Sequence, residues 1–126
     1  MILVDSSIWI DHFRSQNPHL IALLDRRAIL MHPFVLGELA GGNLPSRQIM
    51  LANFQKLPHI IPATNDEVLY LIESRRLFGQ GIGFLDLHLL ASALQQNKKL
   101  WTRDRRLKKA ADDLHAAYDP PQPILP

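Results

Sequence analysis

Four acidic residues are the side chains of this chain best suited to chemistry: Asp5, Glu38, Asp86 and Asp104. Asp5 directly follows the apolar run Ile2–Val4, and Asp104 follows the run from Lys98 to Thr102, so each lies where an expected strand ends. Ligands of parallel α/β sheets gather beyond the carboxyl ends of the strands. Taken singly, Asp5 could equally be a turn residue or a helix cap, and Asp104 could equally cap the helix that follows it.

Glu38 and Asp86 differ from the other acids because their neighbours in the sequence are apolar. Glu38 lies in the run from Phe34 to Ala40, and at helical spacing Asp86 shares a face with Leu89, Leu90 and Ala93. Such a face usually points into the protein, where a carboxylate is costly unless it is paired or bound to a metal. A buried acid matched by an arginine or by a helix end remains the alternative.

Convergence of these acids would make them a cation site. Their mutual repulsion would raise some of the pKa values and require a cation to hold them together. Mg²⁺ and Mn²⁺ are hard ions that accept carboxylate oxygens and water, and an ion of this kind can activate water and neutralise a scissile phosphate. Ser6 and Thr102, each close in sequence to a site acid, could support the ligands, although Ser6 could also be a simple turn residue.

Composition limits the classes of protein that remain. The chain has 126 residues, 47% hydrophobic and 21% charged, which predicts one soluble globular domain over residues 1–126 with a loose tail at 120–126. The absence of cysteine excludes a disulfide, a thiolate metal site and a cysteine nucleophile. No apolar run approaches the roughly 20 residues that a membrane span needs, so we expect a cytoplasmic protein that does not contact membranes.

The order of apolar and polar segments predicts an α/β fold. Short strands are expected at 2–4, 28–31, 59–61, 98–102 and 116–118, with helices between them. The helix after residue 64 has the clearest start, because Thr64 and Glu67 have the spacing of a capping box. Strands that alternate with helices predict an α/β domain with a mostly parallel sheet.

Basic residues gather near the last of the four acids. Half of the 14 lysines and arginines lie between residues 98 and 109, and three of them, Arg103, Arg105 and Arg106, flank Asp104. Positive charge beside the expected site could attract an anionic polymer and help to position it. The same cluster could instead be a solvated helix face.

The segments around the four acids resemble those of PIN-domain ribonucleases of the VapC toxin family. The matching segments are Ile2–Asp11, Val35–Leu39, Phe84–Ala91 and Leu100–Asp104, in the family's order. The resemblance implies a three-layer α/β/α sandwich, an endoribonuclease that depends on Mg²⁺ or Mn²⁺ held by the four acids, a cognate antitoxin and a homodimer. A further acid that some relatives carry after the fourth is absent, because the sequence continues Arg105-Arg106-Leu107.

Two other functions remain open from the sequence. One is a catalytically silent RNA-binding or protein-binding module on the same fold, although a binder has no need of repelling carboxylates. The other is a phosphatase with Asp5 as nucleophile, but Ser7 stands where the best-known enzymes of that design have a second aspartate. His88 is expected on a helix surface, and a contact with the substrate or a part in proton transfer is the alternative. Trp9 and its apolar neighbours are expected to divide between core packing and a groove for a partner helix.

Overall fold

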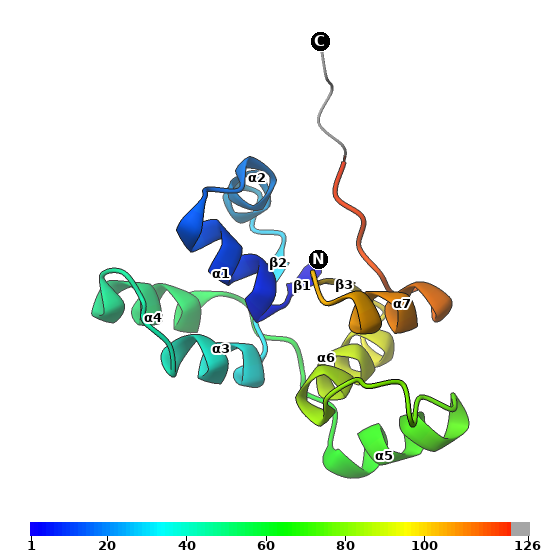
Figure 1. Cartoon of the computed structure of the whole chain (residues 1–126). Coiled ribbons are helices and arrows are strands. Elements are labelled where there is room, and N and C mark those ends of the chain that lie inside the picture. Colours follow the sequence, from blue (N-terminus) through cyan, green and yellow to red (C-terminus); the bar gives the residue numbers. More distant parts are fainter. Residues whose placement is uncertain (122–126) are drawn as a thin grey trace.

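A computed structural model describes residues 1–121 of the chain (Figure 1). Its elements, in chain order, are β1 (Ile2–Val4), α1 (Ser6–Arg14), α2 (Pro18–Asp25), β2 (Ile29–Leu30), α3 (Pro33–Ala40), α4 (Arg47–Lys56), α5 (Asn65–Ser74), α6 (Phe84–Gln95), β3 (Lys99–Trp101) and α7 (Arg105–Asp113). Most of the tail expected at 120–126 lies outside the described residues.

The three strands form a parallel sheet in the order β2-β1-β3, so the first strand of the chain is the central one. Leu3 pairs with Leu30 on one side and with Leu100 on the other. The strands expected at 59–61 and 116–118 are reduced to single parallel bridges, Met31 with His59 and Leu100 with Ala117. Proline explains the first case, because Pro58 and Pro62 flank this segment and cannot donate to a sheet ladder.

Helices cover the sheet on both sides, which confirms the expected α/β/α sandwich. Figure 1 shows α1 to α4 gathered on one side of the strands and α5 to α7 on the other. The interior contains the strand residues Leu3, Val4 and Leu100 together with Leu89 and Leu90 of α6, all at most 1% exposed. Burial from both faces explains why the strands are continuous apolar runs. Among residues 1–121, no helix is both long and apolar enough to span a bilayer.

Several helices begin at side chains that cap them. The predicted capping box is confirmed, because Thr64 accepts from the Glu67 N–H and the Glu67 carboxylate accepts from the Thr64 N–H. At α1 the cap is Asp5, one residue before the helix. Asp104 caps α7. Two of the four candidate site acids are therefore also helix caps.

His32 is a fully buried histidine that caps α3. Its Nδ1 accepts from the Phe34 N–H at 3.0 Å, and its Nε2 has no hydrogen-bond partner within the described residues. Burial, assisted by His88 and His59 nearby, lowers the pKa of His32 to about 4. The folded protein therefore holds this imidazole neutral.

The expectation that His88 lies on a helix surface is wrong. Its side chain is 2% exposed and lies edge-on to the rings of Phe34 and Phe84. The Nε2 atom is 2.7 Å from Asn65 Oδ1, a contact that the sequence did not indicate. This histidine therefore joins α6 to the start of α5 and to α3.

A fall in pH should destabilise the fold through protonation of His32. Its pKa is lower in the folded chain than in the unfolded chain, so its contribution to stability is present above about pH 6.5 and is lost as the pH falls toward 4. Between pH 7 and pH 5 we expect this group to lower the free energy of unfolding by about 2 kcal/mol. Urea unfolding at both pH values should show that His32→Asn, which keeps a capping acceptor, loses this part of the pH dependence.

The exposed His115 provides the matched control for that measurement. It has a φ of 59°, a conformation that asparagine tolerates well, so His115→Asn should leave the pH dependence as it is in the wild type. Equal pH dependence of wild type and His32→Asn would contradict the assignment.

Candidate active site

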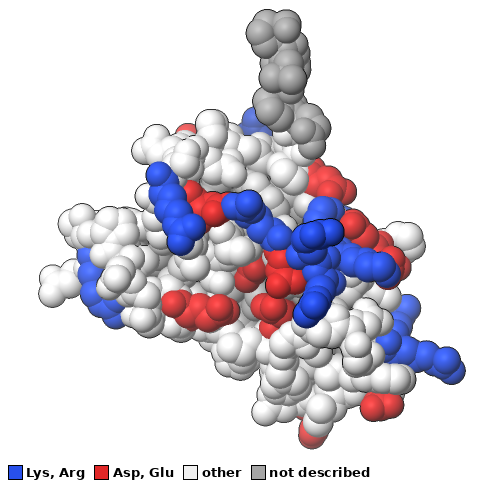
Figure 2. Space-filling model, viewed as in Figure 1, with Lys and Arg blue, Asp and Glu red and all other residues white. Residues whose placement is uncertain are grey.

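The four candidate acids approach one edge of the sheet from four different elements. Asp5 follows β1, Asp104 follows β3, Glu38 lies in α3, and Asp86 lies in the first turn of α6. Figure 2 shows acidic side chains in a hollow near the middle of one face, bordered by basic side chains. Sequence positions up to 99 residues apart thus meet because parallel strands end at the same edge.

Asp5 is buried and held by hydrogen bonds to both carboxylate oxygens. Its Oδ1 accepts from the Ser6 N–H at 2.7 Å, and its Oδ2 accepts from the hydroxyls of Ser7 and Thr102, both at 2.8 Å. Because the side chain is only 4% exposed, these donors take the place of water around the carboxylate. The orientation of the carboxylate is therefore fixed by the fold.

Ser6 and Thr102 link pairs of the candidate acids. The Ser6 hydroxyl lies 3.4 Å from Asp5 Oδ1 and 3.2 Å from Glu38 Oε2, and its single proton can be donated fully to only one of them. Thr102 donates to Asp5 and accepts from the Asp104 N–H at 3.0 Å. These contacts support the expectation that both residues orient the acids.

Ser7 has a structural role here that sequence reasoning did not assign. Its hydroxyl donates to Asp5 Oδ2 and accepts from the Arg103 N–H at 3.1 Å, so it joins α1 to the segment after β3. The sequence contained a weak signal, because Ser7 follows a strand-end aspartate by two residues.

Repulsion among the acids is evident in the pKa of Asp86. Burial of this half-buried carboxyl is the largest cause of the shift, and Asp5, Asp104 and Glu38 add to it, so that the pKa rises to about 6. The pKa of Glu38 is also raised, first by partial desolvation and then by Asp5, while the hydrogen bond from Ser6 opposes the shift. The four acids therefore lie within electrostatic reach of one another.

The donor set fits a hard divalent cation that keeps part of its water shell. Within residues 1–121, no three acidic or histidine side chains are already close enough to hold one ion directly. Mg²⁺ commonly binds through one or two carboxylates and retains several waters, so it does not require such a closed cluster. When the Ser6 hydroxyl donates to Glu38, a lone pair of Asp5 Oδ1 becomes free for a ligand contact.

The arginines around Asp104 differ in their contacts. Arg103 forms an ion pair with Asp11 of α1. Arg106 packs on Gly81, where φ is +77°, a conformation that favours glycine. A Cβ atom there would lie 2.5 Å from the Arg106 Nη1 atom and would displace the guanidinium. Arg105 is exposed in the first turn of α7.

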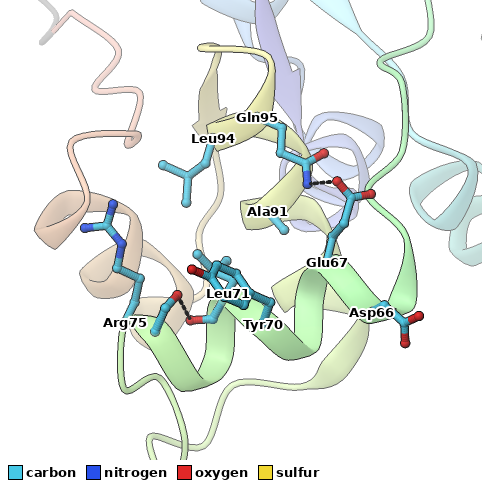
Figure 3. Close-up of a pocket in the computed structure, with 9 residues that line it drawn as sticks. Asp66, Glu67, Tyr70, Leu71, Arg75, Ala91, Leu94 and Gln95 are labelled. Carbon is cyan, nitrogen blue, oxygen red and sulfur yellow. Dashed lines mark hydrogen bonds between the residues drawn. The ribbon is translucent and has the colours of Figure 1, made fainter.

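A separate hollow between α5 and α6 contains none of the four acids (Figure 3). Its wall includes Tyr70 and Leu71 of α5 and Leu94 of α6. Glu67 accepts a hydrogen bond from Gln95 across its upper edge at 2.6 Å. This hollow is not the candidate active site, because the carboxyls whose pKa values are raised, Glu38 and Asp86, lie elsewhere.

Removal of the Asp86 carboxylate should stabilise the protein in the absence of metal. The pKa of Asp86 is higher folded than unfolded, so its ionised form opposes folding at pH 7, by on the order of 1 to 2 kcal/mol after allowance for solvent screening. In a chelator, Asp86→Asn should melt several degrees higher than the wild type, and the difference should shrink as the pH falls below about 6. Asp25→Asn, at an exposed aspartate of α2, should change little; equal melting of wild type and Asp86→Asn would contradict the clustering.

Solved structures with the same fold are similar over nearly the whole chain. The crystal structure of PAE2754 from Pyrobaculum aerophilum aligns with a TM-score of 0.66 at 18% identity, covering 94% of this chain and 87% of that one. The crystal structure of FitAcB from Neisseria gonorrhoeae aligns with a TM-score of 0.61 at 21% identity, covering 89% and 94%. At these identities the alignments show the fold alone.

Sequence comparison identifies the family. The PIN domain model matches residues 2–113. Ribonuclease VapC32 of Mycobacterium tuberculosis (strain CDC 1551 / Oshkosh) is 46% identical over 114 residues, covering 87% of this chain and 90% of the relative, and the protein of the same name from strain ATCC 25618 / H37Rv is equally similar. The chain therefore belongs to the PIN-domain family, in the group of VapC ribonucleases.

Proposed function

We propose that this chain is the toxin of a toxin–antitoxin pair and an endoribonuclease that depends on Mg²⁺ or Mn²⁺. The observation that carries the proposal is the convergence of the four acids at one edge of the sheet. Ser6 contacts both Asp5 and Glu38, and Thr102 contacts both Asp5 and the backbone of Asp104. The pKa of Asp86 is raised by burial and by the charges of the other three acids, in agreement with this geometry. A chain that gathers like charges at the open end of its sheet has a site that favours a cation. The name of the mycobacterial relatives, Ribonuclease VapC32, indicates the reaction.

The residues have distinct roles in the proposed reaction. Asp5, Asp86 and Asp104 are the principal ligands of the ion, and Glu38 completes or orients the site. Ser6, Ser7 and Thr102 hold Asp5 and Asp104 in place through the hydrogen bonds described above. A divalent cation bound here would lower the pKa of water and neutralise negative charge on the scissile phosphate.

Loss of Asp5 should remove the nuclease activity. Incubation of the purified chain with total RNA should give cleavage with Mg²⁺ or Mn²⁺ and none with a chelator. Asp5→Asn keeps the size of the side chain but removes its charge, and we expect cleavage to fall by about 100-fold or more, as when a catalytic electrostatic group is lost. Asp25→Asn should cleave at the wild-type rate.

The same assay distinguishes the two other functions. An Asp5→Asn protein that cleaves as fast as the wild type would contradict the proposal. A silent RNA-binding or protein-binding module would not cut RNA under any of these conditions. A phosphatase that uses Asp5 would release phosphate from small phosphomonoesters without cutting RNA.

We propose that Arg103, Arg105 and Arg106 help to bind the RNA backbone. Arg105 is the most direct test, because Arg103 is paired with Asp11 and Arg106 is packed against Gly81. In a chelator, Arg105→Ala should weaken RNA binding severalfold, and the slope of log affinity against log salt should decrease by about 1. Arg26→Ala, after α2, is the control and should leave the slope unchanged. If Arg105→Ala also leaves the slope unchanged, Arg105 does not contact the RNA.

The partner that we propose is a cognate antitoxin that binds between α1, α2 and α4. Two adjoining hollows there share Leu24, Asn53 and Leu57, and an apolar groove of this kind accepts an amphipathic helix. Trp9 is part of its lining and lies next to Phe54, with 5.1 Å between the ring centroids. Of the apolar residues expected around Trp9, Ile8 is core and Ile10 is exposed.

We also propose that the chain forms a homodimer and acts in the cytoplasm. The dimer is supported by large apolar side chains that α5 presents to solvent, since Leu69 is 52% exposed and Tyr70 75% exposed. The location is supported by the RNA substrate that we propose. Light scattering on the purified chain measures the number of copies directly.

A further inference from the structure

A small hollow next to Glu38 adjoins the four acids and has no role in the site described above. It lies between α1, α3 and the segment that follows α3, has a volume of about 260 Å³, and has Glu38 on its wall. Its walls come from Ile10, Phe13, Arg14, Leu39, Gly42, Asn43 and Leu44. Glu38 belongs both to the hollow and to the group of four acids. A group bound in the hollow would therefore lie next to the scissile phosphate of an RNA bound at the acids.

We propose that this hollow binds one nucleobase of the RNA, in the nucleotide next to the scissile phosphodiester. The inference rests on the proposed nuclease function and adds to it the determinant of base preference at one position. It makes the hollow a subsite for a flat heterocycle rather than a groove for a peptide.

The shape and size of the hollow suit a base. Pockets for drug-sized ligands have volumes of roughly 300 to 1,000 Å³, so this smaller hollow fits a single planar ring system. Leu39 and Leu44 supply apolar surface, and the ring of Phe13 supplies an aromatic surface of the kind on which unstacked RNA bases pack. Ile10, 42% exposed, can cover the base from α1.

The polar groups on the wall match the rest of a nucleotide. Asn43 has an amide that both donates and accepts, as recognition of a base edge requires. Arg14 supplies a cation for the neighbouring backbone phosphate. A peptide helix would instead require a longer apolar groove, and the groove between α1, α2 and α4 fits that description better.

The hollow is also continuous with the expected path of the strand. Ile10 lines both this hollow and the adjacent open cleft formed by Ser7, Asp11, Arg103 and Asp104. An RNA strand that runs from Arg103 across the acids therefore reaches the hollow next, over α1. Its far wall is held in place, because the Arg47 guanidinium donates to the carbonyls of Ala40 and Gly42.

Two neighbouring glycines allow a matched test. Gly42 lines the hollow and Gly41 does not, and a Cβ at either would make only ordinary contacts, at 3.7 Å or more for Gly42 and 3.5 Å or more for Gly41. The wild type, Gly42→Leu and Gly41→Leu would each cleave a degenerate RNA pool in Mn²⁺, and sequencing of the ends would give the base preference at each position.

We expect the wild type to prefer certain bases at one nucleotide beside the cut. In Gly42→Leu that preference should decrease by about fivefold or more, the loss expected for one base-stacking contact, while the pool is still cleaved. Gly41→Leu should keep the wild-type preference. If circular dichroism shows that Gly42→Leu does not fold, Asn43→Ala tests the same subsite from its polar wall and should change which base is preferred.

The outcomes separate this inference from the nuclease proposal. If the wild type cuts no RNA in Mn²⁺, the nuclease function fails, and the subsite with it. If the wild type cuts but Gly42→Leu and Asn43→Ala keep its base preference, the nuclease stands and the subsite is overturned. Weakened antitoxin binding by Gly42→Leu with unchanged base preference would assign the hollow to the protein partner, which also overturns the proposal.

Discussion

The repulsion among four carboxylates at one edge of the sheet is the constraint on which the rest of the structure depends. Like charges gather only where the backbone and its donors hold them, and Asp5 is held most firmly. It follows the central strand, is buried, and is the acceptor for the hydroxyls of Ser7 and Thr102. The Asp86 carboxylate lacks comparable stabilisation, because burial and the three neighbouring acids all raise its pKa. The two aspartates therefore differ in role, because Asp5 is fixed in position whereas the charge of Asp86 responds to its neighbours.

Helix N-termini explain how the fold tolerates this arrangement. Asp5 caps α1, Asp104 caps α7, and Asp86 lies in the first turn of α6. The N-terminus of a helix carries partial positive charge and unpaired N–H groups, so three helices direct favourable electrostatics toward the acids. Capping and cation binding are thus not competing explanations for Asp5 and Asp104. The hydrogen bonds that begin the helices also set the direction in which the carboxylates point.

The sequence predicted the parts of this structure that depend on local pattern. The apolar run before Asp5, the apolar face around Asp86 and the capping box at Thr64 each use short-range spacing, and each predicted the right element. The burial of His88 could not be predicted in this way, because it depends on Phe34 and Asn65 from other elements. The bridge that Thr102 makes between Asp5 and Asp104 depends in the same way on strand order, which a single sequence does not encode locally.

The contacts of Ser7 show why the strand order matters for function as well as for folding. Its hydroxyl connects Asp5 with the backbone of Arg103, and so connects the end of β1 with the segment that leaves β3. Arg103 in turn is paired with Asp11, one helical turn after Ser7 on α1. A displacement of α1 would therefore move Asp5, Arg103 and the exposed Ile10 together. Because Ile10 lies between the open cleft and the hollow beside Glu38, the position of α1 sets both the geometry of the acids and the width of the path along which a strand would pass.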